Sequence, residues 1–466
     1  MKRLLLFAVL ICAFIPPPAG AQGKDGGSFP DMRWRLIGPH RAGRVWTVTG
    51  VPGNAAVYYI GTPAGSAWKT TNGGLTWSSM TDAIGATGIG MVAVAPSNPN
   101  ILYLGTGSNQ LGSGVYRSSD AGATWQNVGL ADTKFITGLL VDPTNPDVVL
   151  ASAGDGGNFG SMVFYNNNPS PARGVYRTTD GGRTWAHTLF IDAQSSVVDL
   201  VSDGTQGRVI FATFTARSPN LQTGPPIYRS DDGGVSWQRV AAKGLPANAS
   251  SANVAVAAGT NQQRVYALTG GRGGSGLYRS DDGGTSFTLM TTRLASAGGR
   301  LYVDPKNPDV LYTMGTSMYR SIDGGKTLNA YKGAPGGDDA HALWIDPTNT
   351  ERMILGADQG PAVSLDRGKS WSPWYTIPNG ELYFVSTDQQ FPYRVYAAQQ
   401  DSGTVSIESR SDFGAIRPND WYPVSGYEQG HIFNDLLNPR YVYSHGGGHT
   451  IVRFDRETGQ SGPVYT

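Results

Sequence analysis

Short runs of alternating apolar and polar residues fill the chain, and turns rich in Gly, Pro, Asn and Asp separate them. The first complete unit, residues 44–80, holds an apolar run from Val45 to Val51, a Pro-Gly-Asn turn, a second run from Val57 to Gly61 and two shorter runs. Alternation with a period of two residues favours β-strands. No long segment has the 3.6-residue period of a helix, so the pattern predicts an all-β protein.

A polar motif recurs between the third and fourth strands of each predicted unit. It follows the pattern Ser/Thr-x-Asp-x-Gly-x-Thr/Ser-aromatic, with residues 118–125 as a clear example, and we call it the aspartate box. The residues at its Asp position are, in chain order, Asn72, Asp120, Asp180, Asp232, Asp282, Asp323 and Asp366. Consecutive boxes lie 41 to 60 residues apart, with a mean of 49. A period of this length is typical of β-propeller blades.

We interpret the seven boxes as structural turns. The box carboxylate can accept hydrogen bonds from amides of its own turn, and the box glycine supplies a positive φ. Most boxes follow a strand that ends aromatic-basic-Ser/Thr, such as Tyr116-Arg117-Ser118. The closing Trp or Phe, replaced by Leu328 in one box, can pack between neighbouring sheets. Because a repeated element does the same work in every repeat, a catalytic role for these carboxylates is disfavoured.

The repeat predicts a β-propeller of four-stranded antiparallel blades. After Asp366 the pattern weakens: the box at Asp412 is degenerate, since Trp421 follows the Asp by nine residues rather than five. A ninth unit, residues 430–466, closes with a different turn at Asp455. We therefore expect seven aspartate-box blades over residues 34–375 and two further blade units over residues 376–466. The sequence leaves open a ring of seven, eight or nine blades, or one propeller with the start of a second.

Strand direction assigns the connections of each blade to two faces. With strands A to D alternating in direction, the A–B turns and the boxes share one face, while the B–C loops and the D-to-A crossings share the other. The longest irregular segments are all B–C loops: residues 107–114, 154–173, 214–226 and 270–276. Long loops on a rigid scaffold are where binding and catalytic residues usually lie. We therefore expect function on the B–C face.

Polar residues of the D-to-A crossings are expected on the same face, close to the ring axis. The candidate binding residues are His40, Arg41, Arg44, Lys134, Arg300, His341, Tyr383, Glu428 and His431. The plainer interpretation is that they only solvate a narrow channel. Glycoside hydrolysis needs two carboxyl groups roughly 5–10 Å apart, and the candidate catalytic residues are Asp338, Asp339 and Glu381.

The N-terminus predicts export. Lys2 and Arg3, the apolar run from Leu4 to Ile15 and a small-residue site at Ala21 are typical of a signal peptide cleaved after residue 21, followed by a polar leader over residues 22–33. The expected location is therefore periplasmic or secreted. The apolar run of twelve residues is shorter than the roughly 20 that a membrane span needs.

Composition excludes several partners and chemistries. The predicted mature chain carries 34 basic against 35 acidic residues, which argues against nucleic acid or an anionic membrane surface as a partner. Cys12, the one cysteine, lies in the signal peptide, so the mature chain has no disulfide, no cysteine nucleophile and no cysteine metal site. His445 and His449 flank three glycines, a pattern that favours a plain hairpin over a metal site. We predict no metal and no cofactor, and we expect a monomer.

The boxes resemble the Asp-box, or bacterial neuraminidase (BNR), repeats of sialidases, xyloglucan hydrolases, sortilin-type receptor ectodomains and photosystem II assembly factors. Residues 34–45, 336–347 and 390–396 resemble segments of large secreted bacterial sortilin-like or glycosyl-hydrolase-like propellers, which look like two seven-bladed rings in tandem. The resemblance to xyloglucan hydrolases implies a catalytic Asp after strand B of the first blade. This chain has Pro63 at that position. The relatives' pattern also has polar groups where this chain has Ser108, Ala340 and Ala342, and the sialidase opening motif is missing before the first box.

These observations favour an exported, non-catalytic β-propeller that binds a glycan or an extended peptide on its B–C face. The first alternative is a divergent glycoside hydrolase of the xyloglucanase or sialidase type, and this is the enzyme class that we expect if the chain is an enzyme. The second alternative is an assembly factor for an envelope complex.

Overall fold

A computed structural model describes residues 35–86, 88–108, 111–154, 169–215, 224–270, 275–294, 299–333 and 338–464. The predicted signal peptide, the leader and Trp34 lie outside these ranges, as do the central parts of the four long B–C loops. Residues from Leu36 onward form one compact unit. Within the described residues, no helix is long and apolar enough to cross a membrane.

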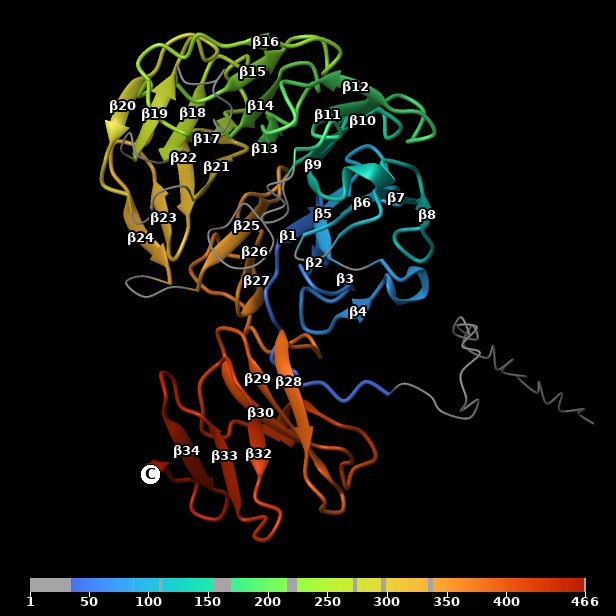
Figure 1. Cartoon of the computed structure of the whole chain (residues 1–466). Helices are drawn as coiled ribbons and strands as arrows, with labels where there is room; N and C mark the ends of the chain where they lie inside the picture. Colours follow the sequence, from blue (N-terminus) through green and yellow to red (C-terminus); the bar gives the residue numbers. More distant parts are fainter. Residues whose placement is uncertain are drawn as a thin grey trace, which may run out of the picture. The chain divides into compact units, whose positions relative to one another are not determined.

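The described strands form nine antiparallel sheets in chain order (Figure 1). The first three sheets are β1 (Thr47–Val51), β2 (Asn54–Gly61), β3 (Ala67–Thr70), β4 (Ser78–Ser79); β5 (Ile89–Val94), β6 (Leu102–Thr106), β7 (Val115–Ser118), β8 (Gln126–Asn127); and β9 (Ile136–Val141), β10 (Val149–Ala153), β11 (Gly174–Thr178), β12 (Ala186–Leu189). The next three are β13 (Val197–Ser202), β14 (Ile210–Phe214), β15 (Ile227–Ser230), β16 (Gln238–Arg239); β17 (Ser251–Val256), β18 (Val265–Gly270), β19 (Gly276–Ser280), β20 (Thr288–Thr291); and β21 (Arg300–Asp304), β22 (Asn307–Met314), β23 (Met318–Ser321), β24 (Asn329–Lys332). The last three are β25 (Ala340–Ile345), β26 (Met353–Ala357), β27 (Gly360–Ser364); β28 (Leu382–Thr387), β29 (Arg394–Gln399), β30 (Gly403–Glu408), β31 (Trp421–Tyr422); and β32 (Ile432–Asn434), β33 (Tyr441–His445), β34 (Ile451–Asp455), β35 (Ser461–Val464).

Each sheet is a meander in which consecutive strands pair, as the sequence pattern predicts. The seventh sheet has three strands, β25, β26 and β27, and each of the others has four. Short 3-10 helices, η1 (Asp82–Ile84), η2 (Ala131–Thr133) and η4 (Pro418–Asp420), lie in connections between strands. The all-β propeller architecture is thus confirmed.

The ring closes at seven blades. One hydrophobic core fills each interface between consecutive sheets from the first to the seventh. A further core joins Tyr58, Ile60 and Trp77 of the first sheet to Ile354 and Val363 of the seventh. The first strands of the seven sheets lie side by side, and β25 returns beside β1 (Figure 1). The eighth and ninth sheets share a separate core.

Hydrogen bonds within the aspartate boxes explain the repeated motif. In the second blade, Ser118 Oγ donates to Asp120 Oδ1 at 2.7 Å, and the Gly122 amide donates to Ser118 Oγ at 2.9 Å. Thr124 donates its amide to Asp120 Oδ1 at 2.9 Å and its hydroxyl to Oδ2 at 2.6 Å. These bonds from Thr124 are the main reason that the pKa of Asp120 falls to about 2. Both carboxylate oxygens are therefore engaged by the turn itself.

Two further parts of the motif join neighbouring blades. The box aromatic packs into the core shared with the preceding blade, as Trp125, Trp185 and Trp237 do. The basic residue of strand C reaches the box of the following blade. Arg177 Nε donates to Gly233 O at 2.9 Å, and Arg229 Nη1 donates to Gly283 O at 2.8 Å. The motif therefore fixes the spacing of blades in both directions around the ring.

Candidate functional site

A group of charged residues surrounds Arg44, which lies just before β1 and so at the start of the ring. Its closest members are His341 and Asp358 of the seventh sheet and Glu381 and Asp401 of the eighth. We call these residues, together with Asp339, Tyr383, Gln400 and Glu428, the Arg44 cluster. They lie in B–C turns, in crossings that lead into a first strand or, for His341 of β25 and Tyr383 of β28, at the beginning of a first strand, which is the face expected to carry function.

Tight hairpin turns present the two aspartates. Asp358 lies between the end of β26 and the start of β27, and Asp401 lies between β29 and β30. Such short connections require a residue with positive φ. Gly360 supplies it in the first turn with φ 125°, and Asp401 itself has φ 54° in the second. Asp tolerates this left-handed conformation better than most residues, which makes it suited to the tip of the turn.

Arg44 binds both aspartates. Its Nε donates to Asp358 Oδ1 at 2.6 Å, and its Nη2 donates to Asp358 Oδ2 at 3.1 Å and to Asp401 Oδ2 at 2.9 Å. His341 Nε2 lies 2.5 Å from Asp358 Oδ1, and the His341 ring packs against Trp46 with centroids 4.9 Å apart. Glu381 Oε2 lies 4.0 Å from Arg44 Nε. One guanidinium thus holds three carboxyl groups together.

The environment separates the proton affinities of the paired carboxyl groups. Burial alone would raise the pKa of Asp358, but the hydrogen bond with His341, the bond with Asp401 and the charge of Arg44 hold it well below its usual range. Burial, together with the hydrogen bond and negative charge of Asp358, raises the pKa of Asp401 to about 7. Asp358 therefore stays ionised, while Asp401 is the member of the pair that keeps a proton near neutral pH.

Glu381 and Asp339 are two further acids with raised pKa values. Burial is the main cause for each, and the negative charge of Asp358 adds to it. The side chains of Glu381 and Asp401 are both 26% exposed, whereas that of Asp358 is 7% exposed. Of the three carboxyl groups around Arg44, Glu381 and Asp401 are therefore the two that a ligand can reach.

Polar neighbours complete the cluster. Glu428 Oε2 accepts a hydrogen bond from the Asp401 amide at 2.7 Å. The Tyr383 hydroxyl bonds to the Gln400 side chain, and Gln400 Nε2 donates to Asp401 Oδ1 at 2.9 Å. The arrangement has a cation, reachable acids and a tyrosine on one surface, which suits a ligand with many hydroxyl groups.

The structure brings together several of the residues that the sequence nominated. Arg44, His341, Tyr383, Glu428, Asp339 and Glu381 all belong to the Arg44 cluster.

Two nominated residues instead serve the packing near the start of the chain. Arg41 is buried, donates to Thr404 O at 2.6 Å and to Ser402 O, and lies over the Trp421 ring, so it ties the segment before β1 to the eighth sheet. His40 is half-buried, and burial lowers its pKa.

The side chains of the remaining nominated residues make their contacts outside the cluster, although Asp338 O accepts a hydrogen bond from the Asp358 amide at 3.2 Å. Asp338 pairs with Lys332 at 2.8 Å, and His431 stacks on Phe384 with centroids 3.9 Å apart. Arg300 lines a cavity of about 230 Å³ with Asp199 among the first strands of the fourth to sixth sheets. Lys134 is exposed before β9.

Sequence reasoning missed Asp358 and Asp401, because it favoured long B–C loops. A usable signal was nevertheless present. Both residues follow a strand B, the blade position where Pro63 stands in the first blade and where the resemblance to xyloglucan hydrolases implies a catalytic Asp. A search of this position in every blade would have found them.

The cluster offers acid–base chemistry. Asp401 and Glu381 contact the same guanidinium, so their separation is no wider than the roughly 10 Å that glycoside hydrolysis allows between its two carboxyl groups. No group of three His, Cys, Asp or Glu residues is placed to hold a metal ion in the part of the chain that the structure describes.

Comparison with known proteins gives distant relatives. No family model matches the chain. A xyloglucanase of Paenibacillus sp is 26% identical over 218 residues, which cover 39% of this chain and 19% of the relative. A xyloglucanase of Hypocrea jecorina (strain QM6a) is 24% identical over 501 residues, which cover 98% of this chain and 52% of the relative. The chain thus spans about half the length of the second relative and less of the first.

A solved structure shares the fold. The GH74 enzyme of Niastella koreensis superimposes with a TM-score of 0.63 at 18% identity, over 93% of this chain and 68% of that chain. The chain is therefore similar to xyloglucanases in sequence and to a GH74 enzyme in fold.

Proposed function

We propose that the chain is a divergent glycoside hydrolase that acts on a soluble β-glucan of the xyloglucan class. The observation that carries the proposal is the Arg44 cluster, in which Asp401 and Glu381 face solvent around one guanidinium. The similarity to xyloglucanases over most of this chain supports the substrate class. This proposal replaces the expectation of a non-catalytic propeller with its first alternative.

In the proposed reaction, Asp401 is the general acid. A carboxyl group with a pKa of about 7 still carries a proton at neutral pH and can pass it to the oxygen of the bond being cleaved. Glu381 acts as the base or nucleophile, and Arg44 contacts both carboxyl groups and so fixes their separation. Asp358 stays ionised and buried and sets the protonation of Asp401.

The further expectations form part of the same proposal. We propose that the boxes belong to the Asp-box class, that residues 34–375 and 376–466 are separate sets of blades and that the latter belong to a second propeller. We also propose that the chain is exported after cleavage of residues 1–21 and acts as a monomer on its glycan.

Turnover of soluble xyloglucan, measured as new reducing ends, tests the proposal. We expect Asp401→Asn and Glu381→Gln each to lower kcat by more than about a hundredfold, as loss of general acid–base catalysis does. Asp366→Asn, a change in an aspartate box, is the matched control and should leave kcat unchanged. Activity should fall as pH rises above 7, because Asp401 then loses its proton.

A second candidate is glycan binding without turnover, which the presence of Pro63 in the first blade favours. Binding of xyloglucan with no release of reducing ends, by a preparation whose fold is intact, would establish this candidate and exclude the hydrolase. Turnover that persists in both cluster variants would exclude the proposed roles of Asp401 and Glu381.

A further inference from the structure

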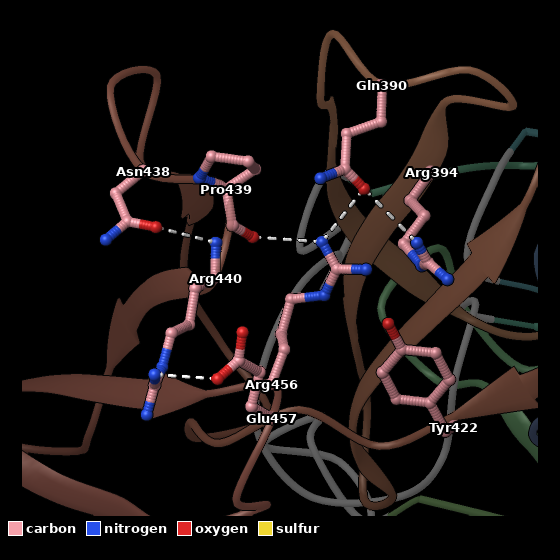
Figure 2. Close-up of a pocket in the computed structure, with 8 residues that line it drawn as sticks. All are labelled: Gln390, Arg394, Tyr422, Asn438, Pro439, Arg440, Arg456 and Glu457. Carbon is pink, nitrogen blue, oxygen red and sulfur yellow. Dashed lines mark hydrogen bonds and ion pairs between the residues drawn. The ribbon is translucent and has the colours of Figure 1, made fainter.

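A polar pocket lies between the eighth and ninth sheets, at the end of the blades opposite the Arg44 cluster (Figure 2). Its volume is about 620 Å³, within the usual range for small-molecule sites. Gln390, Arg394 and Tyr422 line it from the eighth sheet, and Asn438, Arg456 and Glu457 line it from the ninth. We call it the Arg456 pocket.

The register of the strands explains why this gap is open. In the first, second and sixth blades a buried tyrosine of strand B pairs with a basic residue of strand C: Tyr59 with Lys69, Tyr103 with Arg117 and Tyr312 with Arg320. Basic side chains at this position reach the following blade, as Lys69 does when its Nζ donates to Ala121 O at 2.8 Å. In the eighth sheet the corresponding pair is Tyr396 with Ser406. A short serine cannot cross to the next sheet, so the space remains.

Arg456 enters this space from the ninth sheet and leaves donors unused. Its Nη1 donates to Gln390 Oε1 at 3.1 Å and to Pro439 O at 3.0 Å. Its nearest carboxylate oxygen, Asp388 Oδ2, lies 3.9 Å away, beyond hydrogen-bond distance. The Nε atoms of Arg456 and Arg394 are buried without a hydrogen-bond partner among the described residues. In Figure 2 both guanidinium groups reach toward the space above Tyr422.

The charge of the pocket disfavours an anionic ligand. Arg394 pairs with Glu408, and Arg440 pairs with Asp455 and with Glu457 at 2.7 Å. With the buried Asp388 beside Arg456, the network has four acids against three arginines. Unused N–H donors beside an exposed carboxylate and amide instead suit groups that both donate and accept, which are hydroxyl groups.

We propose that the Arg456 pocket is a second glycan site that binds a neutral oligosaccharide. The choice of a glycan among hydroxyl-rich ligands rests on the proposed function. Arg456 and Arg394 donate to sugar oxygens, Glu457 and Asn438 bind sugar hydroxyl groups, and the Tyr422 ring forms part of the floor. The pocket lies at the box end of its blades, so it holds a chain segment that does not occupy the Arg44 cluster.

Hydrogen–deuterium exchange with cellohexaose or a xyloglucan oligosaccharide locates the binding. We expect slower exchange in residues 436–443 and 453–460, in addition to any change in the Arg44 cluster at residues 356–360 and 399–402. Protection confined to residues 356–360 and 399–402 would overturn the second site and leave the proposed function standing. Protection confined to the pocket would support the second site and count against the Arg44 cluster as a glycan site.

Variants test the chemistry of the pocket. Arg456→Lys keeps the positive charge but loses the planar guanidinium and its paired N–H donors. We expect the affinity of this variant for the neutral oligosaccharide to fall about tenfold, because one paired hydrogen bond is lost. Arg453→Lys, the same change at an exposed position of β34 outside the pocket, is the matched control and should bind as the unmodified chain does.

A variant at an exposed residue separates an effect on binding from an effect on folding. Glu457 is 68% exposed on its side chain, so Glu457→Ala should fold normally and still weaken binding. The proposal would be overturned if both Arg456→Lys and Glu457→Ala bound the oligosaccharide with the affinity of the unmodified chain. Tighter, salt-dependent binding of an oligogalacturonide of equal length would also overturn it, because the pocket would then be an anion site.

Discussion

At the scale of single residues, the Arg44 cluster shows how the same type of side chain acquires opposite properties in two short B–C turns. Asp358 and Asp401 each follow a strand B, and both bind Arg44. Asp358 also has His341 and is buried, whereas Asp401 is more exposed and faces the charge of Asp358. The difference in neighbours, and not in residue type, gives one ionised carboxylate and one that retains a proton.

The raised pKa of Asp401 predicts a specific dependence of stability on pH. A carboxyl group with a pKa near 4 when unfolded and about 7 when folded favours the folded state below pH 4, and this contribution is lost as pH rises to 7. Asp401→Asn removes the titration, so the variant should gain in melting temperature relative to the unmodified chain between pH 4 and pH 8. Calorimetry across this range tests it, and parallel curves for the two proteins would contradict it.

At the scale of the blade, the aspartate box is a self-contained hydrogen-bonded turn, and the first box shows what the turn needs. Asn72 takes the place of Asp there, and its Oδ1 accepts from the Thr76 amide at 3.0 Å while its Nδ2 donates to the Thr76 hydroxyl at 2.8 Å. An amide therefore keeps the bond from the turn amide that a carboxylate accepts in the other boxes, and it replaces the bond from the hydroxyl with one of opposite direction. The negative charge is dispensable, and the acceptor for the turn amide is retained.

This comparison predicts the effect of changing a box. Asp120→Ala should lower the free energy of unfolding by about 1–2 kcal/mol, because it removes acceptors for the Thr124 amide and hydroxyl. Asp120→Asn should cost less, since Asn72 already performs this role. Urea unfolding of both variants measures the difference, and an equal loss in the two would contradict the hydrogen-bond explanation.

Blade-level features were predictable because they are local in the chain. The box bonds join residues two to four positions apart, and strand direction alone assigned Arg44, His341 and Glu381 to one face. Asp358 and Asp401 were not predicted as site residues, because their partner Arg44 lies 314 and 357 residues away in the chain. No periodicity within a blade carries information about which blades become neighbours when a ring closes.

At the scale of the whole molecule, closure at seven blades depends on close packing between the first and last sheets of the ring. A methyl group on Gly50 of β1 would lie 2.5 Å from the Trp344 ring of β25. The bare backbone of glycine is therefore what lets the two strands approach.

Gly50→Ala should destabilise the ring by about 1–3 kcal/mol, the usual cost of overpacking a core. Gly462→Ala in β35 is the matched control, since a methyl group there meets no atom within 4 Å. Trp344→Leu should recover part of the loss in the double variant by making room at the contact. Thermal unfolding of the unmodified chain, of Gly50→Ala, of Trp344→Leu and of the double variant gives the coupling energy between the two positions. Additive losses at Gly50 and Trp344 would contradict the packing argument.

The wide separation of Arg44 from Asp358 and Asp401 also sets an order in time. Arg44 emerges early in synthesis, but its partners follow more than three hundred residues later, and pairing of such distant segments is slow compared with formation of a single blade. The first six blades can form while the Arg44 cluster does not yet exist. Any activity that depends on the cluster therefore requires both the closed ring and the eighth sheet, which supplies Glu381 and Asp401, and a nascent or truncated chain that lacks either is inactive.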